Sequence, residues 1–256
     1  MINIKEQARY LATAYPKGGV EAITSKFPNL KVKEAYEIQL QTVAHKMEQG
    51  HIITGKKIGL TSEAMQNSLN VHEPDYGHLL SDMLIKNNGK VPSGHLLQPK
   101  VEGELAFVLK KDLKGPNITA MDVILATDYI VPALEIVDSR IKNWKINLQD
   151  TIADNASSGL YVLGDERFQI HEVDFKKIGM ALYKNDELLN TGAGVACLGN
   201  PVEAVVWLAN KLADYTISLK KGEVILSGAL SEAMPAYEGD VFACKFNQLG
   251  EVRVEF

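Results

Sequence analysis

Apolar and polar positions along the chain predict strands and helices in separate stretches. Residues 105–109 form a continuous apolar run between polar flanks, and residues 131–138, 224–230 and 241–246 repeat this pattern, which is typical of buried strands. Apolar positions recur at helical intervals in residues 2–15, 34–49 and 201–214. Pro201 at the first turn marks the start of the clearest helix. The chain therefore predicts helices in its N-terminal part and mostly strands in its last third.

Turn residues indicate how some of these strands connect. Asn88-Gly89 lies inside residues 84–97 and predicts a hairpin there, and Asn185-Asp186 predicts a second hairpin from residues 180–190. Residues 61–69 have the pattern of a short helix. No repeat or low-complexity linker divides the chain, so we expect only a soft boundary. We place it between an N-terminal helical or α+β segment, residues 1–75, and a larger domain, residues 76–256.

Composition and charge exclude several classes of protein. Of the 256 residues, 46% are hydrophobic and 23% are charged, as in an ordinary globular protein. The net charge of −5 and the absence of a Lys/Arg block argue against a nucleic-acid partner. The first residues lack a signal-peptide pattern, and no apolar run is long enough to span a bilayer. We therefore expect a cytoplasmic protein without a membrane partner, and its two cysteines predict no disulfide framework.

Three glutamates form the first candidate site. Glu102 and Glu104 stand two residues apart before the 105–109 run, so in a strand their carboxylates share one face. One interpretation is a solvated strand end, and the other is a site for a hard cation that offsets the repulsion. Glu135 favours the second, because it is embedded in an apolar strand where an isolated carboxylate is costly.

Two adjacent lysines form a second candidate. Lys56 and Lys57 follow Gly55 in a predicted strand, so their side chains point to opposite faces. We expect one to be exposed and the other to enter the apolar interior. Further along, residues 151–159 are dense in small polar residues, which favours a ligand-facing loop, and we place Ser157 near the substrate.

These motifs together resemble one enzyme family. Val101-Glu-Gly-Glu-Leu-Ala-Phe107, the stretch from Ala133 to Arg140 and Ala153-Asp-Asn-Ala-Ser157 are similar to the 2-oxopent-4-enoate hydratase branch of the fumarylacetoacetate hydrolase superfamily. The resemblance runs from about residue 34 to the C-terminus. It implies an α+β fold with a mixed β-sheet or β-roll core and a smaller, mainly helical N-terminal part.

The resemblance also assigns roles to individual residues. It implies that Glu102, Glu104 and Glu135 bind Mg²⁺ or Mn²⁺. It makes Lys57, the second lysine of its Gly-x-Lys-Ile-Gly pattern, catalytic, with Asp75 of Glu73-Pro-Asp-Tyr-Gly77 as its acid/base partner. The turn that contains Ser227 and Gly228 resembles the loop that binds the substrate carboxylate.

The implied reaction is the hydration of 2-hydroxypenta-2,4-dienoate (2-oxopent-4-enoate) to 4-hydroxy-2-oxopentanoate in the meta-cleavage catabolism of aromatic compounds. The decarboxylation of 4-oxalocrotonate (2-oxohex-3-enedioate) is the alternative, because it uses the same electron sink. A non-catalytic scaffold or binding protein on this fold is a remote third hypothesis. The resemblance further implies a homo-oligomer and leaves room for a complex with a neighbouring pathway enzyme.

Overall fold

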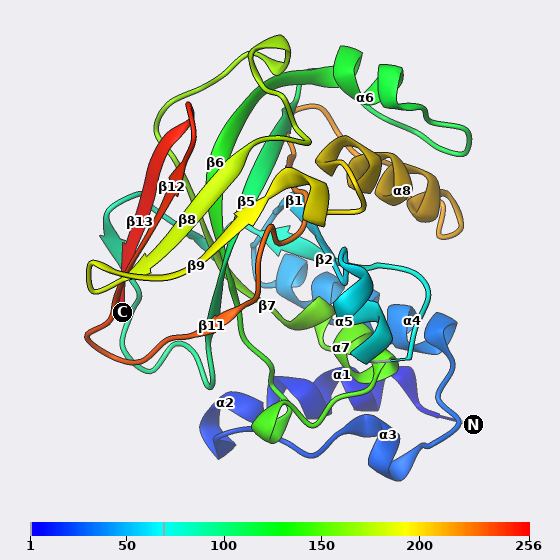
Figure 1. Cartoon of the computed structure of the whole chain (residues 1–256). Coiled ribbons are helices and arrows are strands. Elements are labelled where there is room, and N and C mark those ends of the chain that lie inside the picture. The colour runs from blue at the N-terminus through cyan, green and yellow to red at the C-terminus, as the bar shows by residue number, and fades with distance from the viewer. Residues whose placement is uncertain (1, 69) are drawn as a thin grey trace.

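The computed structural model describes residues 2–68 and 70–256, and its N-terminal part is helical. This part contains α1 (Ile4–Ala12), α2 (Ala14–Lys17), α3 (Ile23–Lys26) and α4 (Val32–Glu48). Asn3 caps α1 by accepting a hydrogen bond from the backbone N–H of Glu6 at 3.2 Å. In Figure 1 α1, α2 and α3 lie at the bottom, and α4 lies above them on the right, near α5. The expected helices at residues 2–15 and 34–49 are therefore present, although the first one is divided at Thr13.

A mixed sheet of eight strands forms the centre of the molecule. Its order is β2-β1-β10-β5-β6-β7-β3, with β11 paired to β5 off this path. The strands are β1 (Ile53–Gly59), β2 (Asp75–Leu80), β3 (Leu84–Ile85), β5 (Lys100–Leu109), β6 (Thr127–Val137), β7 (Ser158–Leu163), β10 (Val224–Leu226) and β11 (Met234–Pro235). β1 pairs with β10 in parallel and with β2 in antiparallel fashion. Segments from both ends of the chain therefore meet in this sheet.

The sheet curls so that strands far apart in its order approach each other. β2 contacts β7, and the Tyr161 hydroxyl of β7 lies 3.1 Å from Thr54 Oγ1 of β1. An apolar cluster fills the concave side. Its members are Leu79, Ala106, Val108, Val131, Ala133, Tyr161, Val224 and Leu226. By strand alternation Glu102, Glu104, Glu135, Lys57 and Asp75 lie on this same side of the sheet.

A second sheet of five strands packs against the convex side. Its order is β4-β13-β12-β8-β9, from β4 (Gly89–Lys90), β8 (Gly179–Lys184), β9 (Glu187–Ala193), β12 (Val241–Phe246) and β13 (Gly250–Glu255). A Cβ atom at Gly103 would lie 2.7 Å from Cys244 Sγ of β12, so glycine lets the two sheets approach closely here. The packing buries the side of β5 opposite to Glu102 and Glu104.

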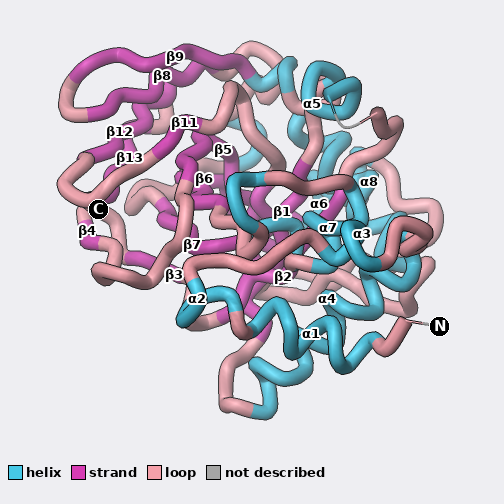
Figure 2. The backbone as a smooth tube through the Cα atoms, turned by 90° about the horizontal axis from the view of Figure 1, so that it is seen from below, coloured by secondary structure: helices cyan, strands magenta, loops and turns pink. Residues whose placement is uncertain are grey.

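The remaining helices lie on the right in Figures 1 and 2, away from β12 and β13 of the second sheet. They are α5 (Glu63–Ser68), α6 (Ala120–Ala126), α7 (Leu148–Ala153) and α8 (Pro201–Ala213), with short 3₁₀ turns η1 (Lys142–Trp144), η2 (Asn155–Ser157), η3 (Ile170–Glu172) and η4 (Gly194–Ala196). The predicted helix at residues 61–69 corresponds to α5, and its last residue, Leu69, lies outside the described residues. None of the helices in the described ranges has the length and apolar character needed to cross a membrane.

One of the two predicted hairpins is wrong. β8 and β9 form the hairpin about Asn185-Asp186, but β3 and β4 do not pair with each other across Asn88-Gly89. β3 instead adds to β7 at the edge of the large sheet, and β4 adds to β13 at the edge of the second sheet. Each segment finds an open strand edge elsewhere, so this turn connects the two sheets. The boundary placed between residues 75 and 76 stays a prediction, and β1, which precedes it, is a strand of the large sheet.

Candidate active site

Three carboxylates converge on the concave side of the large sheet. Glu102 lies opposite Glu135 in the pairing of β5 with β6, and Glu104 lies opposite Ala133. One oxygen from each of the three glutamates lies within 4.8 Å of the others. Glu104 and Glu135 are buried, whereas Glu102 is partly exposed. The period-two spacing of the sequence and the register of two antiparallel strands together produce this cluster.

The cluster is poorly satisfied by the protein alone. Oε2 of Glu104 accepts a hydrogen bond from the backbone N–H of Gly228 at 2.8 Å. Among the described residues, Oε1 of Glu104 and both oxygens of Glu135 have no hydrogen-bond partner. Burial, reinforced by the charge of Glu135, raises the pKa of Glu102 to about 7 and that of Glu104 well above its usual range. Buried, unpartnered carboxylate oxygens are the ligands that Mg²⁺ and Mn²⁺ prefer, so this donor set fits a hard divalent cation.

Lys57 and Asp75 lie beside the glutamates. Lys57 Nζ is 3.1 Å from Glu135 Oε1, close enough for an ion pair but not aligned as a hydrogen bond. Burial lowers the pKa of Lys57, but the charges of Glu135, Asp75 and the other two glutamates outweigh it and raise that pKa above its usual value. Burial raises the pKa of Asp75 to about 6, and the nearby Lys57 opposes this rise. The site thus contains a charged ammonium next to a carboxyl group that exchanges its proton near neutral pH.

Gly59 leaves space for the side chains of Lys57 and Asp75. The sequence alone did not predict this role. A Cβ atom at Gly59 would overlap Asp75 Oδ1 and lie 3.4 Å from Lys57 Nζ. Gly59 is paired with Asp75 in the sheet, on the same face as Lys57. The second glycine of the Gly55-Lys-Lys-Ile-Gly59 motif therefore has a steric role at the candidate site.

The expectation that one of the two lysines is exposed is wrong. Lys56 is 2% exposed and Lys57 is 3% exposed. Their side chains do leave opposite faces of β1, but Lys56 is held in a buried ion pair with Glu223, with Nζ–Oε distances of 2.7 and 2.9 Å. A buried ammonium is tolerated when a carboxylate pairs with it, and Glu223 is far away in the sequence.

Ser157 belongs to an unusual turn next to β2. Asn155, Ala156 and Ser157 have successive left-handed φ values of 55°, 51° and 52°. A Cβ atom at Gly77 would lie 2.6 Å from Ser158 Oγ and would overlap the Asn155 carbonyl oxygen. The turn therefore lies against Gly77 of β2, and Gly77 pairs with Lys57 of the neighbouring strand β1. The Ser157 hydroxyl itself lies 3.2 Å from Thr151 Oγ1.

The Asn155 side chain fastens this turn. Its Oδ1 accepts a hydrogen bond from the His78 backbone N–H at 2.8 Å, and its Nδ2 donates to the His78 carbonyl at 2.9 Å. Asparagine also tolerates the left-handed conformation better than most residues. Asn155 was not singled out from the sequence, and its tolerance of this conformation was the available signal.

The second predicted substrate loop approaches the carboxylates directly. Gly228 has a φ of 108°, and a Cβ atom there would overlap the Thr61 side chain, so glycine is required. Ser227 is fully buried, and within the described ranges its Oγ has no hydrogen-bond partner. An unpartnered hydroxyl next to the N–H that contacts Glu104 is available to a ligand.

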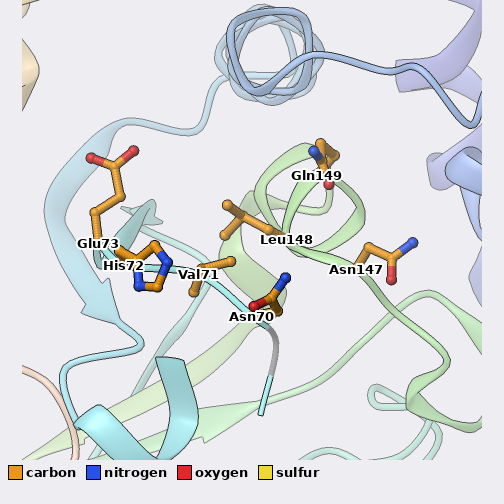
Figure 3. Close-up of a pocket in the computed structure, with 7 residues that line it drawn as sticks. All are labelled: Asn70, Val71, His72, Glu73, Asn147, Leu148 and Gln149. Atoms are coloured by element: carbon orange, nitrogen blue, oxygen red, sulfur yellow. The ribbon is translucent and has the colours of Figure 1, made fainter. Parts of the chain in front are cut away.

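A surface pocket adjoins the start of β2. It has a volume of ≈ 660 Å³ and lies between the segment before β2, which contributes Val71, His72 and Glu73, and the first turn of α7, as Figure 3 shows. None of the three glutamates lines it, but Asp75 follows Glu73 by two residues. The pocket is therefore a neighbour of the candidate site and not the site itself.

Comparisons with known proteins identify the family of this chain. A family model described as "Fumarylacetoacetate (FAA) hydrolase C-terminal" matches residues 56–256. The chain belongs to the fumarylacetoacetate hydrolase family. The resemblance and the α+β fold expected from the sequence are thereby confirmed.

Individual members of the fumarylacetoacetate hydrolase family are similar over most of the chain. The "2-keto-4-pentenoate hydratase" of Paraburkholderia xenovorans (strain LB400) is 45% identical over 98% of this chain and 94% of the relative. The "2-hydroxypent-2,4-dienoate hydratase" of Pseudomonas putida is 48% identical over 78% of this chain and 90% of the relative.

A solved structure, the 4-oxalocrotonate decarboxylase of Pseudomonas putida G7 complexed with magnesium and adipate, is 33% identical. It has a TM-score of 0.97 and covers 100% of this chain and 99% of that chain. The hydratase names support the enzyme class expected from the sequence, a hydro-lyase.

Proposed function

We propose that this chain is a metal-dependent hydratase that converts 2-hydroxypenta-2,4-dienoate and water into 4-hydroxy-2-oxopentanoate. The observation that carries the proposal is the cluster of Glu102, Glu104 and Glu135, whose buried oxygens lack protein partners beside Lys57 and Asp75. The hydratase names of relatives with 45% and 48% identity support the substrate class. The reaction belongs to the cytoplasmic catabolism of aromatic compounds.

The three glutamates are proposed to hold Mg²⁺ or Mn²⁺. The cation supplies Lewis-acid stabilisation of negative charge on the substrate's 2-oxygen. Ser227 Oγ and the region of the Gly228 N–H are proposed to receive the substrate carboxylate, since this hydroxyl is buried and unpartnered in the part of the chain that the structure describes. Ser157 is proposed to border the substrate from the turn above Gly77.

Lys57 and Asp75 are proposed to move the protons. The 2-hydroxy-dienoate must lose the proton of its 2-hydroxyl and gain one on carbon before water adds at C4. A carboxyl group with a pKa of about 6 is suited to accept and return a proton near neutral pH. The Lys57 ammonium, 3.1 Å from Glu135, keeps positive charge beside the reacting groups.

Decarboxylation of 4-oxalocrotonate is the second candidate. The observation in its favour is the TM-score of 0.97 to the decarboxylase of Pseudomonas putida G7. The hydratase is preferred because the identity to the hydratases is 45–48%, against 33% to that decarboxylase. We also propose that the chain forms a homo-oligomer and a complex with a neighbouring pathway enzyme. A monomeric mass in light scattering at micromolar concentration contradicts the homo-oligomer.

An ultraviolet assay separates the two reactions. 2-Hydroxypenta-2,4-dienoate and 2-oxohex-3-enedioate are supplied in parallel, with Mg²⁺, with Mn²⁺ and after chelation. The hydratase proposal expects metal-dependent consumption of the pentadienoate to be the faster reaction. Faster loss of CO₂ from the hexenedioate supports the decarboxylase, and turnover of neither substrate overturns both assignments.

A further inference from the structure

Lys100 stands at the open end of the carboxylate cluster. It is the first residue of β5, two residues before Glu102 and on the same face, opposite Val137 of β6. Glu104, Glu135 and Lys57 are buried, whereas Glu102 and Lys100 are partly exposed. Solvent therefore reaches the cluster from the end of β5 at which Lys100 lies.

The Lys100 ammonium differs from the two lysines of β1. Lys57 is paired with Glu135 and Lys56 with Glu223. Across residues 2–68 and 70–256, the Lys100 ammonium has neither an ion-pair nor a hydrogen-bond partner. Lys100 and Glu102 lie two residues apart on the same face of β5, opposite Val137 and Glu135 of β6. An anion that enters the site therefore meets a cation whose hydrogen-bond donors are free.

Trp144 holds this cation in place. Lys100 Nζ lies 4.5 Å from the centroid of the Trp144 ring, a cation–π contact. The indole N–H of Trp144 donates to the Gln98 carbonyl at 3.0 Å. Asn143 and Trp144 have left-handed φ values of 58° and 54°. Such backbone is costly for tryptophan and persists only where surrounding contacts impose it, often at ligand sites.

We propose that Lys100, positioned by Trp144, binds a second carboxylate at the far end of the substrate. The subsite would let the enzyme take linear six-carbon 2-oxo or 2-hydroxy dicarboxylates in addition to five-carbon monoacids. Lys100 and Glu102 are separated by roughly 6.8 Å along the strand. An extended six-carbon chain spans roughly 6 Å with carbon–carbon bonds of about 1.5 Å. This inference rests on the proposed function, because it assumes that the 2-oxo-acid end lies at the three glutamates.

Two unreactive ligands test the subsite without turnover. 2-Oxoadipate and 2-oxohexanoate have six carbons and the same 2-oxo-acid end, and only the first carries a carboxylate at the other end. Neither has a conjugated double bond to hydrate. Calorimetry in the presence of Mg²⁺ measures the affinity of the parent protein for each. We expect 2-oxoadipate to bind about tenfold more tightly, as for a charge-assisted hydrogen bond, and the preference to shrink with added salt.

Three variants assign the preference to named side chains. Lys100→Gln should lose the tenfold preference while 2-oxohexanoate binds as in the parent, and Lys100→Arg should keep most of it. Trp144→Asn, which suits the left-handed backbone, should reduce the preference by about threefold because the lysine is no longer held.

The outcomes separate this inference from the proposed function. Equal binding of the two ligands by the parent, or a preference that survives Lys100→Gln, overturns the subsite. A loss of affinity for both ligands in Lys100→Gln also overturns it, since Lys100 would then act on the shared end. If neither ligand binds in a Mg²⁺-dependent way, the 2-oxo-acid end does not lie at the three glutamates. That result overturns the subsite as well. Failure of the proposed hydration is read separately, from pentadienoate turnover.

Discussion

Protonation of His78 should govern part of the stability of this protein in mild acid. His78 lies in β2, is 1% exposed, and its Nδ1 is 3.1 Å from Gln39 Oε1. The amide nitrogen of Gln39 donates to the carbonyls of Tyr76 and Ile152, so its oxygen accepts from the imidazole. Burial, assisted by the charge of Lys56, lowers the pKa of His78 to about 3. The folded protein therefore keeps this imidazole neutral well below pH 6.

The sign and size of the effect follow from linkage. Below a pH of about 6.5 the unfolded chain binds a proton at His78 that the folded chain does not bind. The contribution of His78 to the free energy of unfolding therefore falls as pH decreases from about 6.5 towards 3, by about 1.4 kcal/mol per pH unit. Between pH 8 and pH 5 the loss from His78 amounts to about 2 kcal/mol.

A comparison of variants isolates this contribution. Asp75 and Asp154, whose pKa values burial raises to about 6, act in the opposite direction because the folded chain takes up their protons first. They are present in every variant, so their effect cancels in the difference. Urea unfolding at pH 8 and pH 5 is measured for the parent, for His78→Asn, which keeps an N–H donor near Nδ1, and for the exposed control His171→Asn. We expect the loss between the two pH values to be about 2 kcal/mol smaller in His78→Asn alone. The same loss in His78→Asn and in the parent would show that His78 does not resist protonation in the folded protein.

Two further predictions concern the strands around the site. Lys57→Met should lower kcat by about 10²–10⁴-fold while calorimetry shows near-parental metal affinity, and weak metal binding would instead make Lys57 a structural partner of the carboxylates. The neighbouring lysine provides the control. Lys56→Met leaves the buried Glu223 carboxylate without its ion-pair partner, so it should lower the free energy of unfolding by about 3–5 kcal/mol in thermal unfolding. The activity per folded molecule should be retained. Asn155→Ala leaves the His78 backbone N–H and C=O without partners and should cost about 2–6 kcal/mol in urea unfolding. A loss below 1 kcal/mol would show that water replaces both hydrogen bonds.

Local sequence patterns were sufficient for those features that depend on one or two adjacent strands. Period-two alternation placed Glu102 and Glu104 on one face, and the apolar strand around Glu135 indicated a buried carboxylate that needs a partner. The pairing of β5 with β6 then brought the three together. The family resemblance supplied the relation to Asp75, which alternation alone does not reveal.

Features that depend on distant partners were not accessible in this way. Lys56 is buried because Glu223, 167 residues later, pairs with it. The segments flanking Asn88-Gly89 do not form a local hairpin, because they pair with the open edges of β7 and β13 instead. The turn at Asn155 depends on hydrogen bonds to β2, 77 residues earlier. In each case a local preference was overridden by a contact that only the folded chain creates.

Hydration of the dienoate is proposed to require a divalent cation held by Glu102, Glu104 and Glu135. The most direct measurement follows the absorbance of 2-hydroxypenta-2,4-dienoate with protein freed of metal by exhaustive chelation, before and after Mg²⁺ or Mn²⁺ is restored, for the parent and for Glu104→Gln. We expect the chelated parent to be inactive and the added metal to restore formation of 4-hydroxy-2-oxopentanoate. We expect Glu104→Gln, with its fold intact by circular dichroism, to bind the metal more weakly and to recover little activity. Full activity after exhaustive chelation, or parental activity in Glu104→Gln, would contradict this proposal.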